Sequence, residues 1–189
     1  MILHNLTVWN TYTRVEKSVA ESHIKQWAAL SPPVTIQSPY INPAADAPTG
    51  PVDLDTSDEL ALRSLLLGIV HRSIGDYEPS RAFLSDAHKR LPEIKVSTWI
   101  GGVALFELAV LDLKETDAAE KLSVSDVDGL TSLDQTRSAW VRALKSASDK
   151  LDQAMALDSN STDLSSRLDS RITMLRDEIG TKRETLGLV

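Results

Sequence analysis

The stretch that most constrains the fold is residues 61–92, which reads as two helices separated by a glycine turn. Its first half is apolar on several faces and carries Gly68, and Gly75 follows as a helix-ending residue that tolerates a left-handed backbone. Its second half carries the small residue Ala87 and stops at Pro92, because proline interrupts a helix. A small residue in each helix allows close packing, so the pattern predicts an antiparallel helical hairpin.

These spacings are typical of the tetratricopeptide repeat (TPR), a helix-turn-helix unit of about 34 residues. Gly102 lies 34 positions after Gly68 and marks a second repeat. Residues 115–131 carry Asp, Ser and Gly where a repeat would have its short turn, so we expect a loop there. The sequence therefore predicts an all-α fold, a TPR-like antiparallel helix stack (α-α superhelix) of about six helices.

Apolar residues at three- and four-residue steps predict the other helices. The first residues of the hairpin, Thr56 to Glu59, have the capping-box form. In the second hairpin helix, the inward candidates are Ala82, Phe83, Ala87 and Leu91. The expected helices are 6–30, 57–74, 78–91, 95–114, 132–158 and 162–186.

Proline divides the chain. Six of the eight prolines fall within residues 31–56, which predicts an irregular linker or a loop that lies on the surface. We therefore expect three segments: an N-terminal helix (1–30) that packs on the stack, a Pro-rich linker (31–56) and a TPR-like helical domain (57–189).

Composition excludes several classes of function. A net charge of −7 disfavours nucleic-acid binding, and the absence of cysteine excludes disulfides and thiolate chemistry. The four histidines are scattered, and no nucleophile elbow or phosphate loop occurs. The first residues lack the apolar stretch of a secretory signal, and the longest apolar run, 99–113, is too short to span a membrane. We expect no enzyme activity, catalytic residue, cofactor or metal.

Two polar features stand out within apolar helices. Glu107 lies between Phe106 and Leu108, and a buried carboxylate needs a partner. It is either a ligand-binding acid or a structural tie to an arginine such as Arg72 or to backbone amides, and we favour the tie. For the neighbouring pair His71 and Arg72 we likewise favour a structural or surface role.

Three segments occur in an order that resembles a known family: ELALRSLLLGIVHRSIGDY, TWIGGVALFELAVLDL and SSRLDSRITMLRDEI. Over residues 58–178 they resemble the C-terminal half of the tetratricopeptide repeat protein 39 family, which includes the fungal inclusion body clearance protein. The Phe106-Glu107-Leu108 motif is its more specific part, whereas Gly101 and Gly102 depart from the bulkier residues of the family. Family members are much longer, so the chain resembles a C-terminal fragment or a shortened paralogue.

The resemblance implies a non-enzymatic, cytoplasmic protein that works through partners, with links to aggregate clearance, lipid droplets and the mitochondrial outer membrane. The resemblance also allows peripheral association with a membrane or a lipid droplet. The oligomeric state is not predicted.

The repeat numbering predicts the groove that would bind a partner. With Ala61 as the first position, the groove residues are Leu62, Leu65, Ile69, Arg72 and Ser73. They are too apolar for a clamp that holds a peptide carboxylate. Either another part of the chain, such as residues 6–30, fills the groove, or the groove binds a helical or extended segment of a protein partner. The alternative function is a carrier or sensor of an apolar, lipid-like ligand in a closed helical cavity.

Overall fold

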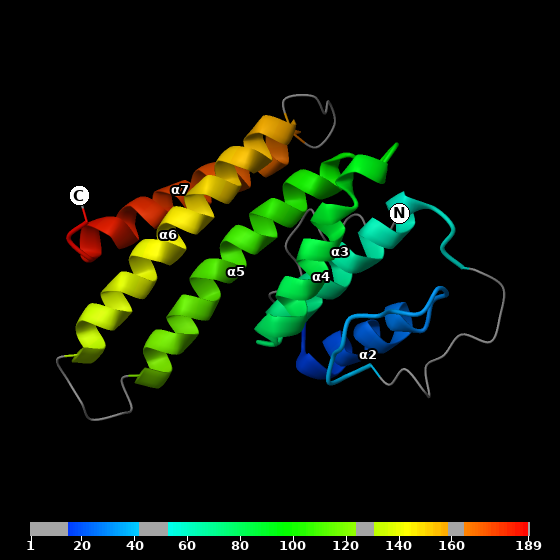
Figure 1. Cartoon of the computed structure of the whole chain (residues 1–189), viewed down its shortest axis with the longest axis horizontal. Coiled ribbons are helices and arrows are strands. Elements are labelled where there is room, and N and C mark those ends of the chain that lie inside the picture. Colours follow the sequence, from blue (N-terminus) through cyan, green and yellow to red (C-terminus); the bar gives the residue numbers. More distant parts are fainter. Residues whose placement is uncertain (1–14, 42–52, 124–130, 159–164, 189) are drawn as a thin grey trace. The chain divides into compact units, whose positions relative to one another are not determined.

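The computed structural model describes residues 15–41, 53–123, 131–158 and 165–188, and all regular structure in these ranges is helical (Figure 1). The predicted all-α helix stack is therefore confirmed. The chain divides into two compact units, Met1–Ala104 and Leu105–Val189. The three segments predicted above, 1–30, 31–56 and 57–189, stay a prediction. The helices are α2 (Lys17–Ala28), α3 (Ser57–Ser73), α4 (Tyr77–Lys89), the short 3₁₀ helix η2 (Leu91–Glu93), α5 (Trp99–Ser123), α6 (Thr131–Asp158) and α7 (Ser165–Thr185).

The first unit is built around the hairpin of α3 and α4, which occupies the stretch expected from the sequence. A Cβ atom added to Gly68 would lie 2.6 Å from Cγ of Leu84 and 3.0 Å from its backbone nitrogen. The Ser80 hydroxyl donates a 2.8 Å hydrogen bond to the Gly68 carbonyl across the same contact. Gly75 forms the turn with φ of +87°, the left-handed conformation that favours glycine. The two helices therefore approach so closely that a side chain at position 68 does not fit.

Helix α3 is enclosed on all sides, as its apolar faces predicted. Every residue from 64 to 72 is buried. The predicted capping box is confirmed, because the Thr56 hydroxyl accepts the Glu59 amide and the Glu59 carboxylate accepts the Thr56 amide. In α4 the expectation for Ala82 was wrong: Ala82 is exposed, and Leu84 is buried instead.

The segment between α4 and α5 is tied back to the hairpin. The Asp58 carboxylate accepts hydrogen bonds from the backbone amides of Lys95 and Val96, both at 3.0 Å, and of Ser97 at 2.5 Å. These amides hold the pKa of Asp58 below its ordinary value. A second close approach lies at Gly101, where an added Cβ would lie 2.7 Å from Cδ1 of Leu91 in η2.

The second unit contains the long helices α6 and α7 together with α5 from Leu105 onward. The loop expected from residue 115 was wrong, because α5 continues to Ser123. Residues 115–123 are rich in Glu, Ala and Lys, which favour helix, and Lys121 pairs with Asp117 one turn earlier at 2.8 Å. Of the apolar stripes predicted for the last two helices, the buried members are Trp140, Leu144, Ala147, Leu151, Ala154, Leu168, Ile172, Leu175 and Ile179. Leu186, the last predicted member, is partly exposed, and Leu164 lies outside the described residues.

Two buried carboxylates on α5 pair with cations from the other two helices. Glu107, which is 1% exposed, accepts a 2.7 Å hydrogen bond from Arg171 of α7, and the same guanidinium lies 4.2 Å from the centre of the Phe106 ring. Asp112 pairs with Lys150 of α6 at 2.6 Å. The structural tie favoured for Glu107 is thus present with Arg171, an arginine that the spacing of the sequence did not indicate.

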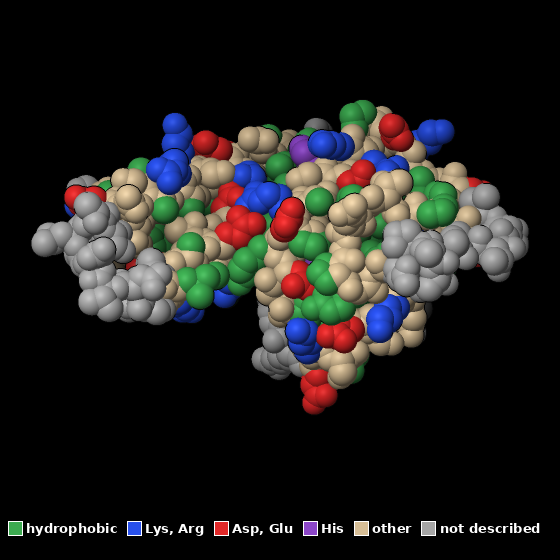
Figure 2. Space-filling view, turned by 60° about the horizontal axis from the view of Figure 1, so that its bottom comes forward, with side chains coloured by type: hydrophobic (Ala, Val, Ile, Leu, Met, Phe, Trp, Pro, Cys, Tyr) green, Lys and Arg blue, Asp and Glu red, His purple; other side chains and the backbone are tan. Residues whose placement is uncertain are grey.

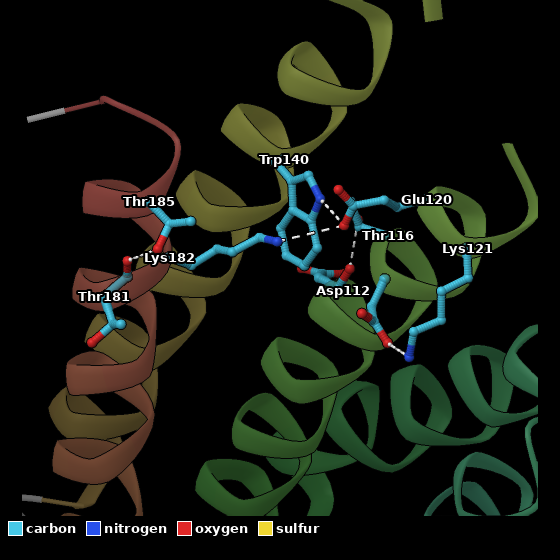
Figure 3. Close-up of polar contacts among 9 residues, drawn as sticks. Asp112, Thr116, Glu120, Lys121, Trp140, Thr181, Lys182 and Thr185 are labelled. Carbon is cyan, nitrogen blue, oxygen red and sulfur yellow. Dashed lines mark hydrogen bonds and ion pairs between the residues drawn. The ribbon is translucent and has the colours of Figure 1, made fainter. Parts of the chain in front are cut away.

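A third polar contact joins all three helices near the end of α5 (Figure 3). Glu120 accepts a 3.0 Å hydrogen bond from the indole nitrogen of Trp140 in α6, and it lies 3.5 Å from the ammonium of Lys182 in α7. The Lys182 ammonium also lies 4.0 Å from the centre of the Trp140 ring, within the range of a cation–π interaction. Along α5 the partners on α7 ascend in number and those on α6 descend, so α7 runs parallel and α6 antiparallel to α5.

Replacing Gly68 with leucine or alanine should destabilise the chain. The new Cβ overlaps Leu84, including its backbone nitrogen, and overpacking of this kind costs about 1–3 kcal/mol. Gly180 in α7 is the matched control, because an added Cβ there meets nothing within 4 Å. Gly180→Ala should stabilise by about 0.5–1 kcal/mol through helix propensity. Urea unfolding of both alanine variants measures this, and an unchanged stability in Gly68→Ala would contradict the close contact.

Removing Arg171 should cost more than removing an exposed arginine of the same helix. Arg171→Met leaves part of the charge of Glu107 uncompensated inside the protein, and we expect a loss of about 2–3 kcal/mol in the free energy of unfolding. Arg176→Met is the control, since Arg176 and its partner Asp152 are 42% and 70% exposed. Such pairs contribute less than about 1 kcal/mol. Equal losses in the two variants would show that the Glu107 pair does not hold the unit together.

Candidate functional site

The five predicted groove residues all lie on α3, but the structure covers most of them. Leu65 is 0%, Ile69 2% and Arg72 9% exposed, whereas Leu62 and Ser73 are partly exposed. Helix α2 packs against α3 within the same unit. Binding of a partner by these residues stays a prediction, and three of them are inaccessible in the folded chain.

Residues 30–41, here called the strap, follow α2 and are held to α3 by polar contacts. One guanidinium nitrogen of Arg63 donates to the carbonyls of Leu30 and Pro32, both at 2.7 Å. The Ser31 amide donates to the Asp53 carboxylate at 2.9 Å. The proline-rich stretch therefore begins as an ordered, non-helical segment. The remainder of the predicted linker at 42–52 lies outside the described residues.

The strap is also held by His71, which is fully buried in α3. Nδ1 of His71 lies 2.7 Å from the Leu67 carbonyl, an acceptor only, so Nδ1 carries the proton. Nε2 is then the acceptor for the Ser38 hydroxyl, 2.7 Å away. The ring stacks on Phe83 of α4 with centroids 5.2 Å apart. Burial lowers the pKa of His71, so the neutral form is favoured.

A serine bonded to a histidine also raises the question of nucleophilic catalysis. Here the third partner is a backbone carbonyl, and the Ser38 oxygen already accepts the Tyr40 amide at 3.2 Å. The buried imidazole contacts the strap and α4. This geometry fits a structural tie, the role favoured above for His71.

A cavity of about 830 Å³ lies between the strap and the start of α4. It is lined by Val34, Thr35, Ile36, Gln37, Ser38, Pro39, Ile41, Gly75, Asp76, Tyr77, Glu78, Pro79 and Ala82. Several of these residues, including Thr35, Gln37 and Glu78, are exposed, so the cavity opens to solvent. Its volume falls within the range of ligand sites, and its lining mixes apolar side chains with hydroxyl, amide and carboxylate groups.

The cavity is acidic. Asp76 and Glu78 are the charged residues of its lining, and no lysine or arginine is among the lining residues that the structure describes. Oδ2 of Asp76 is buried and has no hydrogen-bond partner in the described part of the chain. The pKa of the Tyr40 hydroxyl is raised by burial and by the neighbouring Asp76. The site therefore favours a group that donates hydrogen bonds or carries positive charge.

The sequence analysis did not find this cavity. It is formed by the Pro-rich stretch and the turn of the hairpin, which are about 40 residues apart in the chain. The available signals were the alternating pattern of residues 34–38 and an aspartate directly after the turn glycine.

Comparison with protein-family models, with curated proteins and with solved structures gives no match to this chain. The function is therefore argued from the site itself.

Other kinds of site find no support in the described ranges. These residues contain no group of three or more His, Asp or Glu side chains that could hold a metal ion. None of the helices that the structure describes is long and apolar enough to cross a membrane. On the face shown in Figure 2, Lys and Arg side chains are interspersed with Asp and Glu, and hydrophobic groups lie between them.

His71 should titrate below the ordinary histidine value of about 6.5. Between its folded pKa and about 6.5, the folded chain binds fewer protons than the unfolded chain. The contribution of neutral His71 to the free energy of unfolding is therefore present above this range and is lost as the pH falls through it. Carboxylates such as Asp58, whose pKa is lowered, act only below about pH 5, whereas His88, whose pKa burial also lowers, acts in the same range as His71.

The measurement is an NMR titration of the His71 imidazole combined with urea unfolding from pH 7.5 to 5. We expect a declining free energy of unfolding between about pH 6.5 and 5, reduced in His71→Gln. A His71 pKa at or above 6.5 in the folded chain would contradict the role given to burial.

Proposed function

We propose that this chain is a non-enzymatic protein-interaction scaffold of the TPR type. The observation that supports the proposal most is the hairpin of α3 and α4, whose helices meet at Gly68 as closely as the repeat pattern requires. A scaffold of this kind presents surfaces to partners without chemistry of its own. The tying of Ser38 and His71 to backbone groups supports the same view.

We propose that the groove of this scaffold is filled from within the chain. Arg63 and His71 hold the strap on α3, and Leu65 and Ile69 are buried. We propose that the partner is a protein segment, and that the open cavity beside the α3–α4 turn is the accessible site. By resemblance, the partners would belong to aggregate clearance in the cytoplasm, at the mitochondrial outer membrane or at lipid droplets.

The carrier of an apolar ligand is less well supported. Such a protein needs an enclosed apolar cavity, whereas the cavity beside the strap opens to solvent and carries two carboxylates. We therefore propose the scaffold alone.

The test is affinity purification of the full chain from its native host, followed by chemical cross-linking and mass spectrometry. We expect a stoichiometric protein partner whose cross-links fall on the first unit, near the strap and α4. Gly180→Ala should capture it equally well, and Gly68→Leu should lose it because the hairpin is disrupted. Recovery of a lipid-like ligand without any protein partner would contradict the proposal.

A further inference from the structure

The wall of the cavity that belongs to the strap has unused backbone groups. Residues 33–37 form neither helix nor strand and bend at Ile36, and among the hydrogen bonds between described residues none involves their backbone groups. Arg63 and Ser38 fix the strap on either side of this stretch, at Pro32 and at His71. A non-helical segment held at both ends with unpaired backbone groups can pair with an extended chain of a partner.

The opposite wall supplies charge. Asp76 and Glu78 lie at the start of α4 and line the cavity, and no lysine or arginine is among the described lining residues. Asp76 is the N-cap residue of α4 but makes no side-chain cap bond, so its carboxylate is not used by the helix. Tyr77 and Pro79 add apolar surface beside these carboxylates, which suits the alkyl part of a long basic side chain.

We propose that this cavity binds an extended segment of a partner protein, whose backbone pairs with residues 33–37 and whose lysine or arginine side chain reaches Asp76 and Glu78. The inference rests on the proposed scaffold function and names the chemistry of the partner. An acidic segment would be repelled by Asp76 and Glu78, and a neutral segment would form only the weaker, uncharged hydrogen bonds with them. The cavity therefore selects for a basic residue within an extended segment.

The first experiment uses pools of acetylated, amidated heptapeptides with randomised flanks and a fixed central residue. Pools centred on Arg, Lys, Gln or Glu are titrated into the ¹⁵N-labelled full chain and followed by NMR. The Arg and Lys pools should shift amides of residues 34–41 and 75–82, and the Gln and Glu pools should bind about tenfold more weakly or worse. Binding of the Glu pool as tightly as the Arg pool would overturn the proposal.

The second experiment changes the charges. Asp76→Asn combined with Glu78→Gln should weaken binding of the Arg pool about 10- to 100-fold, because hydrogen bonds to charged groups are lost. The matched control, Asp149→Asn with Glu184→Gln, alters two exposed carboxylates in the second unit and should bind normally. The free energy of unfolding of both double variants, measured with urea, should equal that of the parent to within about 0.5 kcal/mol. Unchanged binding in the first variant would overturn the proposal.

The third experiment tests pairing through the backbone. Arg-centred peptides with N-methyl groups flanking the centre keep the charge but lose amide donors, so they should bind about tenfold more weakly. If these peptides, or N-acetylarginine amide alone, bind as well as the Arg pool, the site recognises a small cation and the peptide assignment falls. If no pool binds while cross-linking still finds a partner on the first unit, this inference fails and the scaffold proposal stands. If no peptide pool binds and no cross-linked partner is found, this inference and the scaffold proposal both fail.

Discussion

The close contact of α3 with α4 at Gly68 is the constraint on which the first unit depends. The absent side chain lets Leu84 lie against the α3 backbone, and the Ser80 hydroxyl bonds to the carbonyl that this approach brings near. The same contact places Phe83 against the His71 ring and sets the start of α4 beside the strap. A wider spacing between the helices would separate the two walls of the cavity. Packing at one glycine is thus linked to the geometry of the proposed site.

The strap shows how a segment without regular structure is held in place. Its ties are hydrogen bonds donated by Arg63 to the Leu30 and Pro32 carbonyls, by the Ser31 amide to Asp53 and by the Ser38 hydroxyl to His71. One backbone bond, from the Leu54 amide to the Ser31 carbonyl, joins them. The strap is therefore held against α3, while the backbone groups of residues 33–37 make no hydrogen bond to other described residues. Covering α3 and leaving the backbone of residues 33–37 unpaired are consequences of the same arrangement.

The helices, the hairpin turn and the capping box at Thr56 could be predicted because local spacing and backbone conformation determine them. The end of α5 could not, since Asp and Ser near residue 120 suggested a loop whereas Ala, Glu and the Asp117–Lys121 pair favour helix. The pairing of Glu107 with Arg171 joins residues 64 positions apart, and no periodicity reveals such a contact. The cavity escaped prediction for the same reason, because it forms only when the strap is placed against the turn.

A double-mutant cycle between positions 68 and 84 tests the central contact most directly. Gly68→Ala introduces the Cβ that meets the Leu84 side chain, and Leu84→Ala removes the atoms nearest to it. If the contact is as close as described, the double variant loses less free energy of unfolding than the two single variants together, by about 1 kcal/mol or more. Additive losses, within about 0.5 kcal/mol, would show that the two residues do not touch and would contradict the account.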